Sequence, residues 1–347
     1  MKRFRETMIA NALARRNGGG GSVAPVWVNG GVVTTFGGTS WNIPEGAAVL
    51  SDGNIVVADA DNNLIKIVTP AGAVTTLAGS GAPASTDGTG TGASFSNPRN
   101  PCVLSGNVII VADVVNHCIR AVTYPGGVVT TLAGSAGNIG SADGTGASAR
   151  FNYPFSTCAL ADGKIAVADR TNQLIRIITY PGGVVTTLAG TVGVTGATDA
   201  TGTNAKFNGP VSVAKTTDGN IVVADAGNNS IRIVTYPGGV VSTLAGSNVA
   251  GNAYLDGAGT NARFAAPNGV AVTPTNIIVV GDMINNCIRL VTNPGGVVTT
   301  LAGSTTPGLV DATGTNARFD WPQGVCVLAN GNVIVTEYNN NRVRLIT

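Results

Sequence analysis

Two sets of charged side chains recur along this chain at a fixed distance from one another. Each acidic residue of the first set is followed, seven residues later, by a basic residue of the second set. Carboxylates and cations held together could bind a charged ligand. A residue that every copy of a repeat contains, however, serves the copy's own structure, so we expect each acid to pair with the base of its own copy or to cap a loop. The acids are Asp59, Asp113, Asp169, Asp225, Asp282 and Glu337, and the bases are Lys66, Arg120, Arg176, Arg232, Arg289 and Arg344.

A second acidic signature lies in glycine-rich segments such as Asp87-Gly88-Thr89-Gly90. Calcium binding needs several oxygen ligands, whereas each segment offers one carboxylate. A phosphate-binding P-loop needs a Lys-Ser/Thr step, which none of these segments contains. We therefore expect turns in which the acid pairs with a basic residue that follows it. The acids are Asp87, Asp143, Asp199, Asp256 and Asp311, and the expected partners are Arg150, Lys206, Arg263 and Arg318.

Histidine and cysteine are sparse in this sequence. His117 is its one histidine, and a catalytic zinc site needs about three protein ligands, commonly histidines. The five cysteines are odd in number and scattered, which is unlike a disulfide framework. Cys102, Cys158 and Cys326 share a repeat column with alanines, so we expect them to pack as small apolar side chains. Nucleophile elbows and H-E-x-x-H motifs are absent from the sequence. We expect no catalytic residue, no cofactor, no metal site and no enzyme activity.

Aromatic residues that depart from the repeat are the candidate binding residues. Tyr124, Tyr180 and Tyr236 each precede a Pro-Gly-Gly turn, and the other copies have no tyrosine there. Exposed rings at turn tips are typical contacts for proteins and sugars, so we expect a protein or carbohydrate ligand on one face. The alternative is that each ring packs on its own proline. The three tryptophans, Trp27, Trp41 and Trp321, are further candidates.

The elements that position these residues follow from the repeat itself. Successive acids of the first set lie 54 to 57 residues apart, and each copy contains four short strand signals separated by turn residues. In the fourth copy these signals cover 211–213, 220–224, 230–235 and 240–244. One small sheet cannot bury both of its faces alone, so neighbouring copies must cover it. The sequence predicts an all-β, six-bladed β-propeller.

The two ends of the repeat predict how the ring closes. The last copy ends after its third strand, at residue 347, and the missing fourth strand is present at residues 31–38. We expect this orphan strand to pair with residues 342–346. Such a clasp joins the two ends of the array and removes an unpaired sheet edge.

The repeat resembles the NHL family, named for an Asn-His-Leu step. The matching steps are Asn62-Asn63-Leu64, Asn116-His117-Cys118 and Asn172-Gln173-Leu174, and the glycine-rich linker at 256–267 is also similar. The resemblance covers residues 31–347 and implies a six-bladed propeller. It departs from the family in having Asn or Gln where the family often has His. Because that family includes enzymes as well as non-catalytic binding modules, the resemblance narrows function only modestly.

Charge and hydropathy restrict the partners. The formal net charge is +2, but the first 16 residues sum to +4, so the repeats carry about −2 and do not form a basic nucleic-acid surface. The chain contains no run long enough to span a membrane, and residues 1–16 lack the apolar core of a signal peptide. We expect no nucleic acid, no membrane span and no secretory signal.

The segment before the repeats is a further candidate binding region. Residues 1–16 are rich in helix formers, and Phe4, Met8, Ile9 and Leu13 fall near one helical face. Residues 17–26 form a glycine-rich linker, and residues 27–347 form the propeller domain. We expect residues 1–22 to dock a protein partner in a larger assembly. A disordered leader and a membrane-surface or targeting helix are the alternatives.

These features favour a non-catalytic binding or display propeller tethered by its N-terminal helix. The short leader and linker resemble the anchors of bacteriophage virion proteins. This resemblance suggests a virion surface or tail-associated protein that contacts the host or neighbouring subunits. A metal-dependent lactonase or hydrolase and a general protein-interaction NHL module are the alternative functions.

Overall fold

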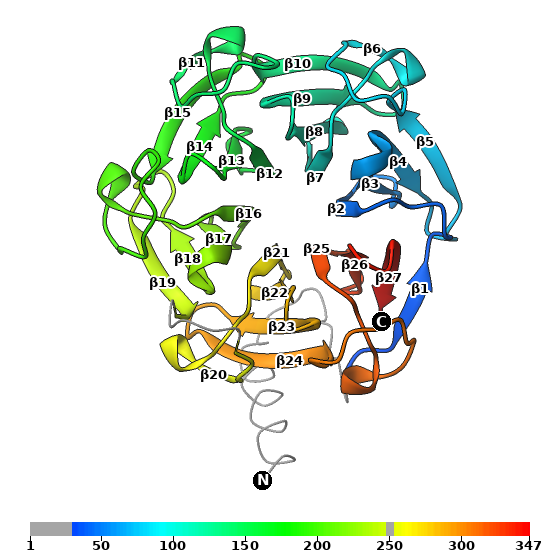
Figure 1. The fold of residues 1–347 in the computed structure, drawn as a ribbon, viewed down its shortest axis with the longest axis vertical. Helices are drawn as coiled ribbons and strands as arrows, with labels where there is room; N and C mark the ends of the chain where they lie inside the picture. The colour runs from blue at the N-terminus through cyan, green and yellow to red at the C-terminus, as the bar shows by residue number, and fades with distance from the viewer. Residues whose placement is uncertain (1–29, 248–252) are drawn as a thin grey trace, which may run out of the picture.

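Six antiparallel sheets stand radially around one axis in the computed structural model, which describes residues 30–247 and 253–347 (Figure 1). Each sheet is a blade whose strands we call a to d from the axis outward. The blades are β2(Pro44–Val49), β3(Ile55–Asp59), β4(Leu64–Val68), β5(Val74–Ala78); β7(Pro98–Leu104), β8(Val108–Asp113), β9(Cys118–Thr123), β10(Val128–Gly134); β12(Pro154–Ala159), β13(Ile165–Asp169), β14(Leu174–Ile178), β15(Val184–Ala189); β16(Pro210–Lys215), β17(Ile221–Asp225), β18(Ser230–Val234), β19(Val241–Gly246); β21(Pro267–Val272), β22(Ile277–Asp282), β23(Cys287–Thr292), β24(Val297–Gly303); and β25(Pro322–Val327), β26(Val333–Glu337), β27(Arg342–Ile346), β1(Val33–Phe36). The predicted six-bladed propeller is confirmed.

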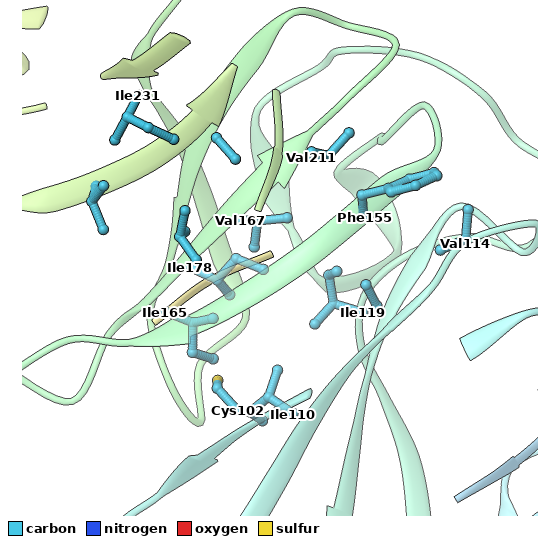
Figure 2. Close-up of a cluster of buried hydrophobic side chains, with 14 of the residues drawn as sticks. Cys102, Ile110, Val114, Ile119, Phe155, Ile165, Val167, Ile178, Val211 and Ile231 are labelled. Carbon is cyan, nitrogen blue, oxygen red and sulfur yellow. The ribbon is translucent and has the colours of Figure 1, made fainter. Parts of the chain in front are cut away.

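Burial on both faces explains why the b strands are almost entirely apolar up to the acid that ends each of them. In β3 and β17 every residue is buried, because each b strand has a neighbouring blade on both sides. Figure 2 shows Ile110 and Ile119 of the second blade near Ile165, Val167 and Ile178 of the third, within one buried cluster. The outer d strands instead alternate between buried and exposed residues. The core therefore lies between blades, so no blade can fold as a separate unit.

The ring closes as the sequence predicts. Strand β1 pairs antiparallel with β27, from Val33 opposite Ile346 to Phe36 opposite Val343. The carboxylate of Asp311 also accepts a hydrogen bond of 2.9 Å from the backbone N–H of Thr35. The two ends of the array are thus held by a full strand pairing and by a side chain of the sixth blade.

The d–a connections contain short elements that the strand pattern did not predict. Three blades gain a fifth strand, β6(Gly88–Thr89), β11(Gly144–Thr145) or β20(Gly257–Ala258), which pairs with the outer edge of strand d. Covering that edge removes backbone groups that would otherwise be unpaired. In the described residues, the 3-10 helices of these connections are η2(Gly90–Gly92), η3(Gly146–Ser148), η4(Gly202–Asn204), η6(Gly259–Asn261) and η7(Gly314–Asn316), and two further ones, η1(Ala60–Asn62) and η5(Ala226–Asn228), lie in b–c loops.

The disc has two faces, which we name after the connections that they carry. The b–c face carries the b–c loops, the d–a connections and the starts of the a strands. The a–b face carries the a–b turns and the c–d turns. Within the residues that the structure describes, no helix is long and apolar enough to span a membrane.

The candidate docking residues Phe4, Met8, Ile9 and Leu13, and also Trp27, lie outside the described residues. Docking through residues 1–22 therefore stays a prediction.

Candidate functional site

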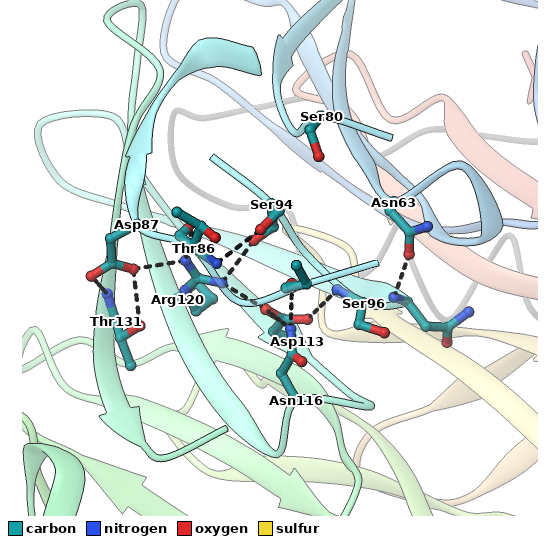
Figure 3. Close-up of polar contacts among 12 residues, drawn as sticks. Asn63, Ser80, Thr86, Asp87, Ser94, Ser96, Asp113, Asn116, Arg120 and Thr131 are labelled. Atoms are coloured by element: carbon teal, nitrogen blue, oxygen red, sulfur yellow. Dashed lines mark hydrogen bonds and ion pairs between the residues drawn. The ribbon is translucent and has the colours of Figure 1, made fainter. Parts of the chain in front are cut away.

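The repeated acids and bases form an ion-pair network around a buried arginine in five of the six blades. In the second blade Arg120 is fully buried and contacts two carboxylates, Asp113 and Asp87, each at 2.7 Å (Figure 3). It also donates to the carbonyl oxygens of Thr86 and Ser94 at 3.0 Å. The expected pairing of each acid with the base of its own blade is confirmed. The same double contact is made by Arg176, Arg232, Arg289 and Arg344.

Burial sets the protonation of these acids. It raises the pKa of Asp169, Asp225 and Asp282 to about 6, while the paired arginine and the hydrogen bonds oppose it. The arginines already hold both acidic sets, so neither set is free to bind a ligand or to transfer a proton to one.

One expected pairing is wrong. The acid of each d–a connection binds the strand-c arginine, as Asp87 binds Arg120, rather than the basic residue that follows it in the connection. Arg150 instead donates to backbone carbonyls, including that of Ala149 at 2.7 Å, and Arg318 does likewise. The buried guanidinium can reach two carboxylates at once, whereas Arg150 lies at the surface end of its segment, where backbone oxygens are nearer.

The first blade replaces this network and buries a candidate tryptophan. Lys66 lies 2.5 Å from Asp59 and 4.9 Å from the ring centre of Trp41. Trp41 is only 5% exposed and donates from its ring N–H to the carbonyl of Gly37 at 2.9 Å. It occupies the place that Phe95 has beside Arg120 in the second blade. Trp41 is thus a packing residue and offers no binding surface.

The histidine column links neighbouring blades. The Nδ1 atom of His117 accepts a hydrogen bond of 3.1 Å from the backbone N–H of Tyr153 in the next blade. Because Nδ1 accepts, the neutral ring carries its proton on Nε2. Burial lowers the pKa of His117 and so favours this neutral form. The equivalent acceptors are Asn63, Gln173, Asn229, Asn286 and Asn341, which bind the N–H groups of Asn97, Gly209, Ala266, Trp321 and Ile43.

This ring of six bonds explains the departure from the Asn-His-Leu step. The column requires an acceptor atom that reaches the next blade, and Asn and Gln amides provide it as well as a neutral imidazole does. The sequence did not reveal the ring, because each bond joins a side chain to a backbone group 34 to 37 residues away, or 298 away where the ring closes.

All five cysteines are free and buried. Burial raises the pKa of Cys102 and Cys326 to about 12, so these thiols stay protonated. The thiolate is the reactive form of cysteine, and the expected packing role is confirmed.

The three tyrosines lie on the a–b face, but two of them pair with a neighbouring blade. The hydroxyl of Tyr236 donates to Asp162 at 2.7 Å, and that of Tyr124 donates to Asp52 at 2.8 Å. Each acid lies in the a–b turn of the preceding blade. Tyr180 faces a turn that has Ser105 in the place of the acid, and it is 37% exposed. A third role, the joining of blades, thus accounts for two of the three rings.

The departures from the repeat that remain gather at the axis on the b–c face. The residue after the first proline of each a strand differs in every blade, and we call these six residues the axial ring. Every member is at most partly exposed, so their side chains fill the axis at this end. The axial ring consists of Glu45, Arg99, Phe155, Val211, Asn268 and Gln323.

Glu45 is the centre of the polar half of the axial ring. Its side chain is 1% exposed and lies 2.7 Å from the Nη1 atom of Arg99. With its amide nitrogen turned inward, Gln323 donates to the same carboxylate. Burial raises the pKa of Glu45 to about 7 against the opposing charge of Arg99. Arg99 in turn donates from Nε to the side-chain oxygen of Asn97 at 2.6 Å.

The other half of the axial ring brings cations and an apolar ring together. The guanidinium carbons of Arg99 and Arg170 lie 4.5 and 4.7 Å from the ring centre of Phe155. Across the axis, the buried side-chain oxygen of Asn268 has no hydrogen-bond partner, and its amide nitrogen lies 3.7 Å from the sulfur of Met283.

Exposed aromatic side chains surround the axial ring on the same face. Trp321 and Tyr153 are each 37% exposed, and the ring of Trp321 packs against that of Tyr338, with centroids 5.6 Å apart and planes tilted by 44°. Both exposed residues have positive φ, 54° and 53°. This conformation is unfavourable for bulky side chains, and the fourth blade has Gly209 in the same column. Of the candidate aromatic residues that the structure describes, Trp321 alone is exposed on this face, and sequence reasoning missed Tyr153 and the whole axial ring.

Comparison with known proteins places the fold in a family. The NHL repeat matches residues 42–68 and 319–344, which contain the b–c segments of the first and last blades. The NHL repeat-containing protein 2 of Bos taurus is 26% identical over 326 residues, which cover 84% of this chain and 44% of that protein. The chain is an NHL-repeat β-propeller. It spans less than half the length of this curated relative.

Solved structures of proteins with different functions show the same fold. An auxiliary nutrient binding protein from Bacteroides thetaiotaomicron has a TM-score of 0.65 and 17% identity, over 90% of this chain and 69% of that chain. A gluconolactonase from Xanthomonas campestris has a TM-score of 0.61 and 12% identity, over 94% and 98%. Binding proteins and enzymes share the architecture, so the fold alone does not decide function.

The donor set of this NHL propeller does not fit a divalent metal ion at the axis. The axial ring contains one carboxylate, Glu45, and its oxygens are already bound by Arg99 and Gln323. A hard cation prefers several oxygen ligands, and a guanidinium beside the carboxylate would repel it. Across residues 30–247 and 253–347, no three His, Cys, Asp or Glu side chains are placed to share an ion.

A shallow cavity of about 470 Å³ lies on the a–b face of the NHL propeller. The ends of a strands and the a–b turns of neighbouring blades form it, with Lys215 as its charged side chain. Val272, Pro274 and Leu328 supply apolar walls. It lacks the convergent polar groups that mark the axial ring.

Proposed function

We propose that this NHL propeller is a non-catalytic binding module that engages its partner with the b–c face. The observation that carries the proposal is the gathering of non-repeated residues there: exposed Trp321 and Tyr153, and Arg170, around one axis. Trp, Tyr and Arg are the residue types that most often dominate the free energy of binding at protein interfaces. The six-bladed frame would hold them rigidly, which lowers the entropy cost of binding.

The chemistry of the remaining groups supports a non-catalytic role. The recurrent acids are bound by arginines, and the cysteines are buried and protonated. His117 is buried and uses Nδ1 for an interblade bond. Elemental analysis of the purified protein tests the alternative of a metal-dependent lactonase. A divalent ion bound in a one-to-one ratio would contradict the proposal.

Capture of a partner from the native source tests the b–c face. We expect wild-type protein on a solid support to retain a partner that Trp321→Ala and Tyr153→Ala retain at least about tenfold less, the effect of losing one strong contact residue. Tyr180→Ala is the matched control, because Tyr180 is equally exposed, at 37%, on the opposite face. Equal capture by wild type and Trp321→Ala, or an equal loss in Tyr180→Ala, would contradict the proposal.

The finer part of the proposal concerns assembly. We propose that residues 1–22 tether the disc to a larger structure, for which the virion of a bacteriophage is the sequence-based candidate. Support for it comes only from the pattern of Phe4, Met8, Ile9 and Leu13 and from the glycine linker. Deletion of residues 1–22 should abolish incorporation and leave the melting temperature unchanged. Incorporation of the shortened protein at the wild-type level would exclude the tether.

A further inference from the structure

Arg170 differs from every other arginine in the described residues. Its guanidinium has no hydrogen bond or ion pair with another described protein group, whereas the guanidinium groups of the other arginines there each have at least one, as those of Arg150 and Arg342 do. It also occupies an otherwise uncharged column. The equivalent residues are Ala60, Val114, Ala226, Met283 and Tyr338. The repeat therefore does not require a charge here.

The guanidinium of Arg170 is held beside the axis. It lies 4.7 Å from the ring centre of Phe155, and Arg99 approaches the same ring at 4.5 Å. On the other side, a methyl group at Gly209 would lie 3.9 Å from the Nε atom of Arg170. Side chains of two adjacent blades thus place two cations around one apolar ring.

The axial ring provides a carboxylate for at most one of these two cations. Glu45 is the one carboxylate of the axial ring, and it contacts Arg99. Burial raises the pKa of Glu45 to about 7, so at neutral pH it opposes these cations less than an ordinary glutamate would. Partial desolvation and the charge of Arg99 both lower the pKa of Arg170, so the surroundings oppose its charge.

A further group at the axis also lacks a partner. The side-chain oxygen of Asn268 is buried and accepts no hydrogen bond from the part of the chain that the structure describes, although buried polar atoms nearly always have a partner. It belongs to the same axial ring as Arg99 and Phe155. A ligand that carries both an anionic group and a hydrogen-bond donor would complement the guanidinium groups and this acceptor.

We propose that the axial ring is a subsite for a phosphate or carboxylate group, which Arg170 binds with the help of Arg99 above the ring of Phe155. This inference rests on the proposed function of the b–c face and names the chemistry that this face recognises. Guanidinium groups bind both anions through paired, charge-assisted hydrogen bonds. Phosphate and carboxylate share this chemistry, so the group could belong to a free metabolite or to an acidic residue of the partner.

Titration calorimetry with inorganic phosphate and with glutarate, at constant ionic strength in chloride, tests the subsite. We expect wild-type protein to bind at least one probe and Arg170→Ala to bind it at least about tenfold more weakly. Arg170→Lys should be intermediate, because lysine keeps the positive charge but cannot form the paired hydrogen bonds of a guanidinium. Lys215→Ala is the control, since it removes an exposed cation at the opposite end of the axis. A circular dichroism melt of each variant checks that it is folded.

The results separate this inference from the proposed function. Absence of binding by wild type, binding by Arg170→Ala within twofold of wild type, or an equal loss in Lys215→Ala would overturn the subsite. Capture that still depends on Trp321 would leave the binding function standing in each of these cases. If phosphate binds and also blocks capture, the anionic group belongs to the partner. If phosphate binds and capture is unchanged, the subsite holds a free anion.

Discussion

At the scale of single residues, the buried arginines are the most constrained part of each blade. Arg232 is fully buried and lies 2.7 Å from Asp225, which is buried as well. The first blade shows that the site can accept a lysine in place of the arginine. There, Lys66 contacts Asp59 but no acid of a d–a connection. Removing the cation would leave an unpaired buried carboxylate, which costs far more than the net gain from the intact pair.

We therefore predict that Arg232→Met destabilises the protein by about 3–5 kcal/mol, the usual cost of breaking a buried ion pair. Arg232→Lys should lower the stability less, because it keeps a cation near Asp225 and loses only the second contact, to Asp199. Urea unfolding followed by circular dichroism measures both. A loss below about 1 kcal/mol for Arg232→Met would show that the pair does not stabilise the blade.

His117 gives a prediction about pH. Its pKa is lowered in the folded protein, so between the folded and unfolded values the unfolded chain binds more protons. Stability from this residue is complete above the unfolded pKa of about 6.5 and is lost as the pH falls below it. Protonation would also turn Nδ1 from an acceptor into a donor and break the bond to Tyr153.

We predict that His117→Asn removes this part of the pH dependence and leaves the protein folded, since four other blades use Asn in the same column. Melting temperatures at pH 7.5 and 5.5 measure it. The wild type should lose more stability than the variant on acidification. The buried acids titrate in both proteins, so the difference between them isolates His117. Equal losses would contradict the prediction.

At the scale of elements, turns of neighbouring blades hold each other on the a–b face. Tyr236, in a c–d turn, donates to Asp162, in the a–b turn of the preceding blade. Asp52 raises the pKa of Tyr124 through the equivalent bond. Burial and the hydrogen bond to Asp162 raise the pKa of Tyr236. Tyr180 has the same place in its own blade but no acid opposite it.

We predict that Tyr236→Phe lowers stability, by on the order of 1 kcal/mol or less because the pair faces solvent. Tyr180→Phe should have no measurable effect, because its hydroxyl has no acidic partner in the neighbouring turn. Differential scanning calorimetry of the two variants compares them under the same conditions. Equal shifts in melting temperature would mean that the interblade bond adds nothing.

At the scale of the whole molecule, the sequence predicted what every blade shares and missed what only one blade contains. The pairing of Asp113 with Arg120 and the place of the closing strand follow from period and strand alternation. The axial ring does not, because its signal is variation: six different residues follow six equivalent prolines. The contact of Gln323 with Glu45 joins the sixth and first blades at the axis, and only the closed ring brings them together.

Closure itself gives the last prediction. Strand β1 covers the edge of β27, and Val33 is 1% exposed, while Ile346 and Val343 are fully buried. Burial of each such apolar side chain contributes about 1.5–3 kcal/mol. Deleting residues 1–38 removes β1 and leaves an apolar edge strand, which is a template for pairing with another chain. Deleting residues 1–29 keeps β1 and is the matched control.

We expect the protein without residues 1–38 to melt at a lower temperature and to form oligomers in light scattering. The protein without residues 1–29 should stay monodisperse, with an unchanged melting temperature. Adding a synthetic peptide of residues 30–38 to the longer deletion should restore part of the lost stability, because the peptide can pair with β27 and reach Asp311. If the longer deletion melts like the shorter one, the clasp is not what holds the ring closed, and the packing between the first and sixth blades must suffice.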